Sequence, residues 1–235
     1  MNGFAPYFRL NPNKGLNFEM IEPFIRNHQY NHIKKHIDYL QRTCETVTDP
    51  RVVASVRSNA EAGILGLFPN AEESQLELLA GVAKLWQADE FQQYLRSAES
   101  CLTAFPPITE KQIRKLFPKA KKLPIPDLSG EVKTVTYLGW TDISTNKMFL
   151  VYPLDGELVG IEGKFTPTNK KGICFLCNRH EETALFTAVT KTRPTNASPD
   201  YYKAVGNYLC LDSHACNNNI TDVEPLERYI RQVIC

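Results

Sequence analysis

The sequence lacks the features that would place the protein in a membrane or in the export pathway. No stretch of its 235 residues approaches the roughly 18 consecutive apolar residues by which a membrane-spanning helix is recognised. The start of the chain, MNGFAPYFRLNPNKGLNFEM, contains no continuous apolar core of the kind that a signal peptide needs. We therefore expect a cytoplasmic protein that has no contact with a membrane.

Motifs of several common enzyme classes are also missing. The chain has no G-x-x-x-x-G-K-[ST] phosphate loop, no G-x-G-x-x-G fingerprint and no G-x-S-x-G turn. His28, His32 and His36 are spaced by four residues, but no carboxylate is placed among them as in H-E-x-x-H. The spacing favours a partly exposed helix face over a metal site. No catalytic residue is predicted.

Net charge of one sign is nearly absent. The 27 lysines and arginines and the 26 aspartates and glutamates leave a formal net charge of +1. Global charge alone therefore cannot attract nucleic acid, although a local basic patch can. Hydrophobic residues make up 43% and charged residues 23%, which is typical of globular proteins. The length suits one large domain or two small ones.

A change of pattern at Phe105-Pro106-Pro107 indicates two domains, because a Pro-Pro pair ends helices and stiffens a joint. Residues 1–19 show no period and are expected to be a disordered extension or an expression remnant. In residues 20–105, apolar residues recur at three- and four-residue steps, and Asp49-Pro50 is a typical helix start. This half predicts an antiparallel four-helix bundle. Residues 106–235 form the second domain, which makes the fold class α+β.

In the second domain the period changes to two, which predicts strands and then a C-terminal helix. Asp155-Gly156 is a strong hairpin signal. Gly160 and Gly163 lie inside one predicted strand, where glycine indicates a bulge or a close contact. The expected strands cover Val132–Tyr137, Lys147–Tyr152, Glu157–Phe165, Thr183–Thr190 and Tyr202–Cys210.

Four of the seven cysteines form the strongest local signal. An odd number of cysteines in a reducing compartment fits metal ligands or free thiols better than disulfides. Cys174 and Cys177 form a C-x-x-C knuckle that can direct two thiolates at one ion, and Cys210 and Cys216 follow as a second pair. Structural zinc favours four such ligands in a closed tetrahedron. These cysteines predict one structural zinc ion in a treble-clef-like α/β domain.

Other interpretations of these cysteines stay open at this point. The four could be buried free thiols, or the C-x-x-C could be a thioredoxin-like redox pair, although that pair opens a helix after a strand. His214 could replace one cysteine as a ligand. A zinc ion held by four thiolates has no open position at which to activate water. The pattern therefore indicates a scaffold, whereas a zinc hydrolase would need an open site.

Two surface features could bind a partner. One is a basic segment without any acidic residue, which could meet RNA phosphates or an acidic protein, or could be a solvated face. The other is a set of apolar residues beside the cysteines, which could form an interface or pack inside the domain. The basic residues are Lys111, Arg114, Lys115, Lys119, Lys121 and Lys122, and the apolar ones are Ile173, Phe175, Tyr208 and Tyr229.

Several motifs together resemble the elongation factor G-binding proteins of the fusidic-acid-resistance type. The resemblance runs from about Met20 to the C-terminus and is most specific in the zinc domain. The motifs are His28-Gln29-Tyr30-Asn31, Leu138-Gly139-Trp140-Thr141, Gly172-Ile173-Cys174-Phe175-Leu176-Cys177-Asn178, Gly206-Asn207-Tyr208-Leu209-Cys210-Leu211-Asp212-Ser213, Cys216-Asn217 and Thr221-Asp222.

The resemblance implies a helical bundle followed by a four-cysteine zinc-finger domain. It further implies a non-enzymatic protein that binds elongation factor G and promotes its release from the ribosome, and so rescues translation when fusidic acid locks the factor in place. The contact surface would lie around the zinc finger, with Tyr208 and Tyr229 as aromatic contacts and Ile173 as an apolar one. Val205 stands where relatives carry a lysine. We expect a monomer. The alternative function is a ribosome- or RNA-binding zinc module that acts through residues 111–122.

Overall fold

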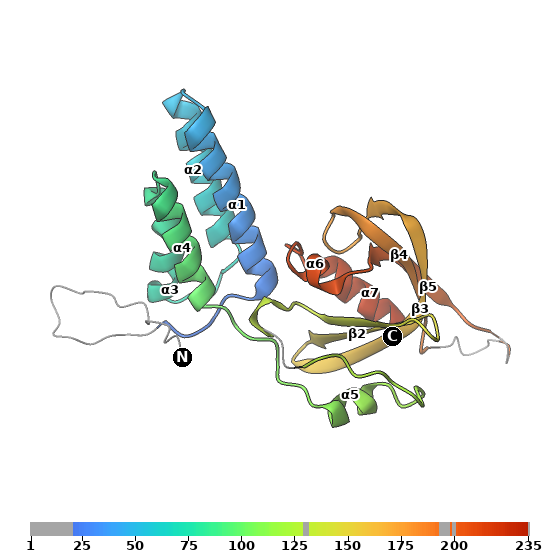
Figure 1. Ribbon diagram of the computed structural model, residues 1–235. Helices are drawn as coiled ribbons and strands as arrows, with labels where there is room; N and C mark the ends of the chain where they lie inside the picture. The colour runs from blue at the N-terminus through green and yellow to red at the C-terminus, as the bar shows by residue number, and fades with distance from the viewer. Residues whose placement is uncertain (1–20, 129–131, 193–197, 199–200, 235) are drawn as a thin grey trace. The chain divides into compact units, whose positions relative to one another are not determined.

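The computed structural model describes residues 21–128, 132–192, 198 and 201–234 (Figure 1). The chain divides after Thr103 into two compact units, each with its own apolar core. The prediction made for residues 1–19 falls outside the described residues. Within the described ranges, no helix is both long enough and apolar enough to cross a membrane.

The N-terminal unit is helical. The start of its second helix is as predicted, because the Asp49 carboxylate accepts the N–H of Arg51 at 2.8 Å and Pro50 takes the first helical position. The antiparallel four-helix arrangement stays a prediction. The helices are α1 (Asn27–Thr46), α2 (Pro50–Leu65), α3 (Glu73–Ala80) and α4 (Ala88–Ser100), with a 3-10 turn at Gly81–Lys84.

Apolar side chains make up most of the centre of this unit. Ile33, Ile37 and Leu40 follow one face of α1 at the predicted spacing, and each is fully buried. Where the chain enters and leaves the unit, the N–H of Thr103 donates to the carbonyl of Ile25 at 2.8 Å. This bond ties the segment before α1 to the segment after α4.

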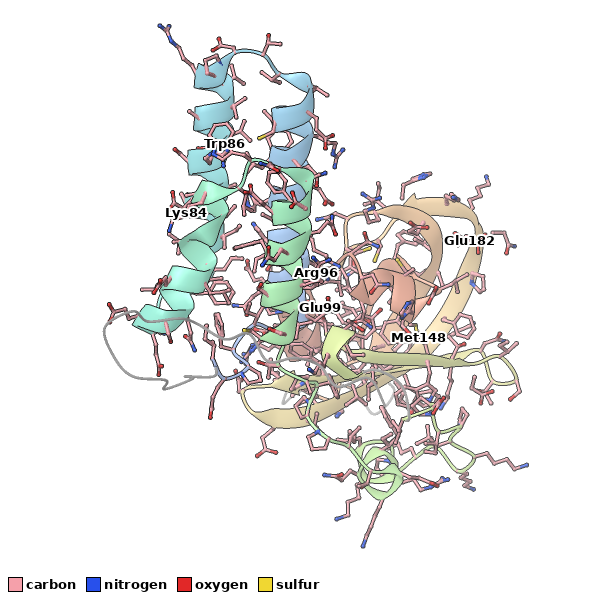
Figure 2. The ribbon with its side chains drawn as sticks, turned by 60° about the vertical axis from the view of Figure 1, so that its left-hand side comes forward. Lys84, Trp86, Arg96, Glu99, Met148 and Glu182 are labelled. Carbon is pink, nitrogen blue, oxygen red and sulfur yellow. The ribbon has the colours of Figure 1, made fainter. Side chains whose placement is uncertain are left out.

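Arg57 is a buried cation in this mainly apolar core. Its guanidinium donates to the carbonyl oxygens of Ala83 and Leu85, and it lies 4.0 Å from the ring centre of Trp86. Lys84, which ends the 3-10 turn, and Trp86 are labelled in Figure 2. Carbonyl acceptors and an aromatic face replace the water that a buried guanidinium loses. Arg57 therefore holds the 3-10 turn and Trp86 against α2.

The C-terminal unit is built on a five-stranded antiparallel sheet in which each strand pairs with the next (Figure 1). Asp155 and Gly156 both have positive φ and form the predicted hairpin turn between the second and third strands. The mixed helix-and-sheet class predicted from the sequence is confirmed. The strands are β1 (Leu138–Asp142), β2 (Lys147–Leu154), β3 (Glu157–Ile173), β4 (His180–Val189) and β5 (Ala204–Cys210).

Two strand predictions need correction. The first strand was expected at Val132–Tyr137, but Val132–Thr134 is a 3-10 turn and β1 begins at Leu138. The reason is that the N–H groups of Thr136 and Tyr137 donate to the side chain of Asn217, so they are not available to a strand ladder. The third strand continues to Ile173, beyond its expected end at Phe165, after an irregularity between Pro167 and Lys171.

Both faces of the sheet are covered over β2. Alternate residues of β2 point to opposite faces, so Met148 and Leu150 join one core while Phe149 and Val151 join another. Helix α7 (Glu224–Ile234) packs on the first face with α6 (Ser213–Asn217), and α5 (Glu110–Leu116) packs on the second. A Cβ atom at Gly160 would lie 2.8 Å from the Cβ of Leu116, so this glycine allows α5 to approach β3. The predicted close contact at Gly160 is thus confirmed.

Candidate metal centre and adjoining surface

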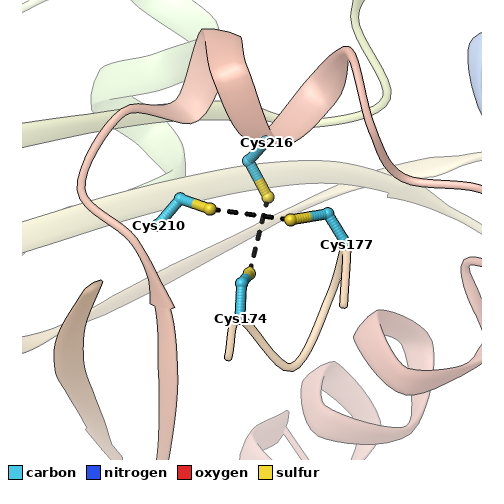
Figure 3. Close-up of side chains that lie close together, drawn as sticks. All are labelled: Cys174, Cys177, Cys210 and Cys216. Atoms are coloured by element: carbon cyan, nitrogen blue, oxygen red, sulfur yellow. Dashed lines mark hydrogen bonds between the residues drawn. The ribbon is translucent and has the colours of Figure 1, made fainter. Parts of the chain in front are cut away.

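Four cysteines from three separate segments meet in the C-terminal unit (Figure 3). Cys174 and Cys177 lie in the turn between β3 and β4, Cys210 ends β5, and Cys216 lies in α6. The turn is shaped locally, since Asn178 has a positive φ of 55° and its N–H donates to the carbonyl of Cys174 at 2.9 Å. The backbone therefore directs both thiols of the knuckle to one side.

The arrangement of the sulfur atoms fits a tetrahedral metal ion. The four Sγ atoms lie within 4.8 Å of one another, with 3.8 Å between Cys174 and Cys216 and 3.6 Å between Cys177 and Cys210. Four sulfurs at about 2.3 Å from a zinc ion would be about 3.8 Å apart. All four residues are buried, which suits a closed structural site.

The electrostatics of the cluster favour a cation. The neighbouring thiols, Cys177 first, lower the pKa of Cys174 because they donate hydrogen bonds to its thiolate. The pKa of Cys216 is raised by hydrogen bonding to Cys174 and to the other thiols, and burial adds to the effect. The thiols therefore influence one another's ionisation strongly, and four buried thiolates can exist together only when a cation compensates their charge.

Polar contacts around the cluster fix its helix in place. The side-chain amide of Asn217, next to Cys216, accepts the N–H groups of Thr136 and Tyr137 at 2.7 and 3.1 Å and donates to the carbonyl of Tyr137 at 2.9 Å. The Ser213 hydroxyl donates to the carbonyl of Gly139 at 2.7 Å. Metal ligation at Cys216 is in this way connected to the start of β1.

His214 is not one of the converging groups. It is exposed on α6, and its Nε2 lies 3.2 Å from the Asn218 side-chain nitrogen. The four thiols complete a coordination set without it. The structure therefore offers an all-cysteine site and no open position for a reacting water.

The apolar residues predicted beside the cysteines divide into exposed and buried ones. Ile173 and Tyr208 have 59% and 52% of their surface exposed. Phe175 is half-buried against Tyr229, with 5.5 Å between ring centres. Tyr229 itself is only 2% exposed. This corrects its expected place on a contact surface, because it supports the knuckle from within the core.

Sequence reasoning missed part of the exposed apolar surface. On β4 and β5, Leu185 stands opposite Tyr208 and Val189 stands opposite Ala204, all on the sheet face that points away from α7. Val189 is 56% exposed. We call Leu185, Val189 and Tyr208 the bare sheet face. Apolar residues at both even and odd positions of Thr183–Thr190 were a sign of it, but the strand order was needed to join it to Tyr208.

The basic segment lies apart from the cysteines, on α5 and the turn after it. All of its basic residues are exposed, including Lys115, Lys119, Lys121 and Lys122, which were predicted as contacts. Arg114 pairs with Glu110 at 2.6 Å within the same helix. The segment therefore presents its charge to solvent.

Comparison with known proteins identifies both units. Residues 24–106 match the family model described as "Elongation factor G-binding protein, N-terminal", and residues 114–232 match "FBP C-terminal treble-clef zinc-finger". A solved structure described as that of the fusidic acid resistance protein FusC is similar over 90% of this chain and 98% of its own, at 27% identity and a TM-score of 0.73. The comparison with curated proteins gives no match. The chain therefore belongs to the elongation factor G-binding protein family, and its four cysteines hold the one structural zinc ion of a treble-clef zinc finger.

Proposed function

We propose that this protein binds elongation factor G and promotes its release from ribosomes on which fusidic acid has locked it. The family assignment and the similarity to FusC support the choice of partner and the link to the drug. The observation that carries the proposal is the buried four-cysteine cluster with the exposed residues Ile173 and Tyr208 close to it in the chain. A closed zinc site does not offer the chemistry of an enzyme, so the protein would act by binding.

The zinc ion would make the docking surface rigid. It joins the knuckle, β5 and α6, and the N–H of Phe175 also donates to the carbonyl of Tyr208 at 2.9 Å. Tyr208 is thereby held in place although half of its surface is exposed. Rigid aromatic and apolar side chains lose little entropy on binding and commonly supply most of an interface's binding energy. We assign the contact with elongation factor G to Ile173 and to the bare sheet face, which includes Tyr208.

Release would follow from differential binding. A ligand shifts an equilibrium only by the difference between its affinities for the two states. If the protein binds more tightly to a conformation of elongation factor G that the ribosome disfavours, the factor dissociates faster and the drug stays chemically unchanged. The protein would act in the cytoplasm as a monomer, with its N-terminal unit forming an antiparallel four-helix bundle.

Size-exclusion chromatography with purified elongation factor G tests the partner. The wild-type chain is expected to co-elute with the factor, and Tyr208→Ala is expected to weaken the complex by about 30-fold, as for an aromatic interface anchor. Tyr39→Ala is the matched control, because Tyr39 is 60% exposed on α1 in the other unit. Equal loss in both variants, or no complex at all, would contradict the proposal.

The release step needs a separate measurement. The off-rate of labelled elongation factor G from ribosomes stalled with fusidic acid is expected to rise when the wild-type chain is added. Tyr208→Ala should raise it less at the same concentration, because fewer factors are bound. If the complex forms but the off-rate is unchanged, the protein binds elongation factor G without promoting its release, and the release step is ruled out.

A further inference from the structure

The basic segment, residues 111–122, concentrates positive charge that the rest of the chain does not have. It contains six lysines and arginines and no acidic residue, although the whole chain carries only +1. All six basic residues are exposed, and only Arg114 has an ion-pair partner among the described residues. Five lysines therefore keep their charge available to a partner.

The segment is held firmly by its apolar residues. Ile113, Phe117 and Leu123 are at most 5% exposed and pack against β2. The ring of Phe117 lies 5.1 Å from that of Phe149, and Gly160 leaves the space that α5 occupies. The lysines are thus displayed on a backbone that is fixed to the sheet.

The same packing decides which kind of partner fits. A protein interface usually needs exposed aromatic or apolar anchors, and in residues 111–122 the large apolar side chains point inward. Single-stranded nucleic acid is bound by stacking bases on exposed aromatic rings, and the segment's only aromatic residue, Phe117, is buried. Lysines alone bind phosphates as point charges without reading sequence.

We propose that the basic segment binds the phosphate backbone of double-helical RNA. Each lysine that neutralises a phosphate releases a condensed counterion, so the affinity should fall steeply with salt and depend little on base sequence. Helix α5 packs on one face of the sheet, over β1, β2 and β3. The same face continues over β4 and β5, where it is the bare sheet face. A contact with elongation factor G and one with RNA can therefore be made from one side of this unit.

The inference rests on the proposed function in one respect, which is the source of the RNA. If the protein docks on ribosome-bound elongation factor G, the RNA nearby is ribosomal. The contact would then hold the protein at the ribosome while the zinc-domain surface engages the factor. The binding of phosphates itself needs only the lysines.

Fluorescence anisotropy with a short labelled RNA duplex tests the proposal at several KCl concentrations. The test variant changes Lys115, Lys119, Lys121 and Lys122 to glutamine. A control variant removes the same charge from exposed positions of the N-terminal unit. The control substitutions are Lys35→Gln, Arg51→Gln, Lys84→Gln and Arg96→Gln.

The wild-type and control proteins are expected to bind the duplex with a steep salt dependence. The test variant should bind at least about tenfold more weakly at low salt. The slope of log K against log[KCl] should be smaller in magnitude by about 3.6, which is about 0.9 for each of the four lysines. Equal RNA binding by the test and control variants, or no binding by the wild-type chain, would overturn the proposal.

Binding of the same variants to isolated elongation factor G separates the remaining outcomes. The test variant is expected to bind the factor as the wild-type chain does. Loss of this affinity with unchanged RNA binding would make the segment a protein-docking surface and also overturn the inference. Failure of the wild-type chain to bind the factor would count against the proposed function. The RNA-binding measurement would still decide the inference about the basic segment.

Discussion

The two units of the chain are stabilised in different ways. In the N-terminal unit, apolar side chains such as Ile33, Ile37 and Leu40 supply the core, and its described residues contain no candidate metal cluster. In the C-terminal unit, four thiolates join segments that are far apart in the sequence, such as Cys174 and Cys216, which are 42 residues apart. Packing holds one unit, and packing together with metal ligation holds the other.

This difference bears on function. Apolar packing tolerates many substitutions, because the stabilisation is spread over all the side chains of the core. A zinc ion instead fixes a few atoms. Here those atoms belong to cysteines that are close in the chain to exposed residues, since Ile173 precedes Cys174 and Tyr208 lies two residues before Cys210. The comparison therefore predicts that metal removal and core mutation affect different units.

The largest effect is expected from Cys174→Ser. Structural zinc contributes about 10–16 kcal/mol of apparent binding free energy, which is as much as the whole stability of a typical domain. The variant should lose its zinc and unfold the C-terminal unit, while the helical N-terminal unit keeps its circular dichroism signal. Zinc analysis and thermal melts would check this. Cys44→Ser, in the N-terminal unit, is the control and should keep both zinc and fold.

Ile33→Ala should produce the opposite pattern. It removes a fully buried side chain from α1, and such a cavity costs about 2–5 kcal/mol. The N-terminal unit should melt earlier while the zinc content stays at one per chain. Val52→Ala, at a position that is 45% exposed on α2, should change the melting temperature very little. Zinc loss in Ile33→Ala would show that the units do not separate in this way.

A smaller effect is expected from Asn217→Ala. The substitution leaves the buried N–H groups of Thr136 and Tyr137 without their acceptor, which costs about 1–3 kcal/mol. The C-terminal unit should be less stable in urea but still bind zinc. The neighbouring Asn218 is exposed, so Asn218→Ala is the matched control. Equal stability of the two variants would contradict the role given to Asn217.

The smallest effect is expected in the stability of the N-terminal unit at acid pH. Burial, helped by His32 and Lys35, lowers the pKa of His36 in the folded unit. The unfolded chain therefore binds this proton at higher pH, so the stability of the unit is full above about pH 6.5 and decreases as the pH falls. Urea melts at pH 7.5 and 5.5 should show the decrease. His36→Gln should reduce it, and an unchanged pH dependence would exclude His36 as its source.

Sequence reasoning worked where the signal is local. The helix start at Asp49, the hairpin at Asp155-Gly156 and the C-x-x-C knuckle each depend on a few neighbouring residues, and the structure contains all three. It failed where distant residues decide. Asn217 takes the N–H groups of Thr136 and Tyr137 from 80 or more positions away and delays the first strand.

Burial of aromatic residues was equally difficult to predict. Tyr208 lies two residues before Cys210 and Tyr229 lies in the final helix, and from the sequence either could have been exposed. Tyr229 is buried between the rings of Phe175 and Phe186, and its hydroxyl donates to the carbonyl of Val205 at 3.1 Å. The local sequence around each tyrosine is compatible with either a buried or an exposed side chain. Only the packing of α7 on the sheet decides that Tyr229 is buried and Tyr208 is exposed.

The central claim is that the zinc ion shapes the surface that binds elongation factor G. Calorimetric titration of the factor with the full chain, before and after removal of zinc by a chelator, tests it most directly. The account predicts a one-to-one complex with the zinc-loaded chain and a loss of affinity of at least about 100-fold without zinc, with binding restored when zinc is returned. Equal affinity of the zinc-loaded and zinc-free chains would contradict the claim.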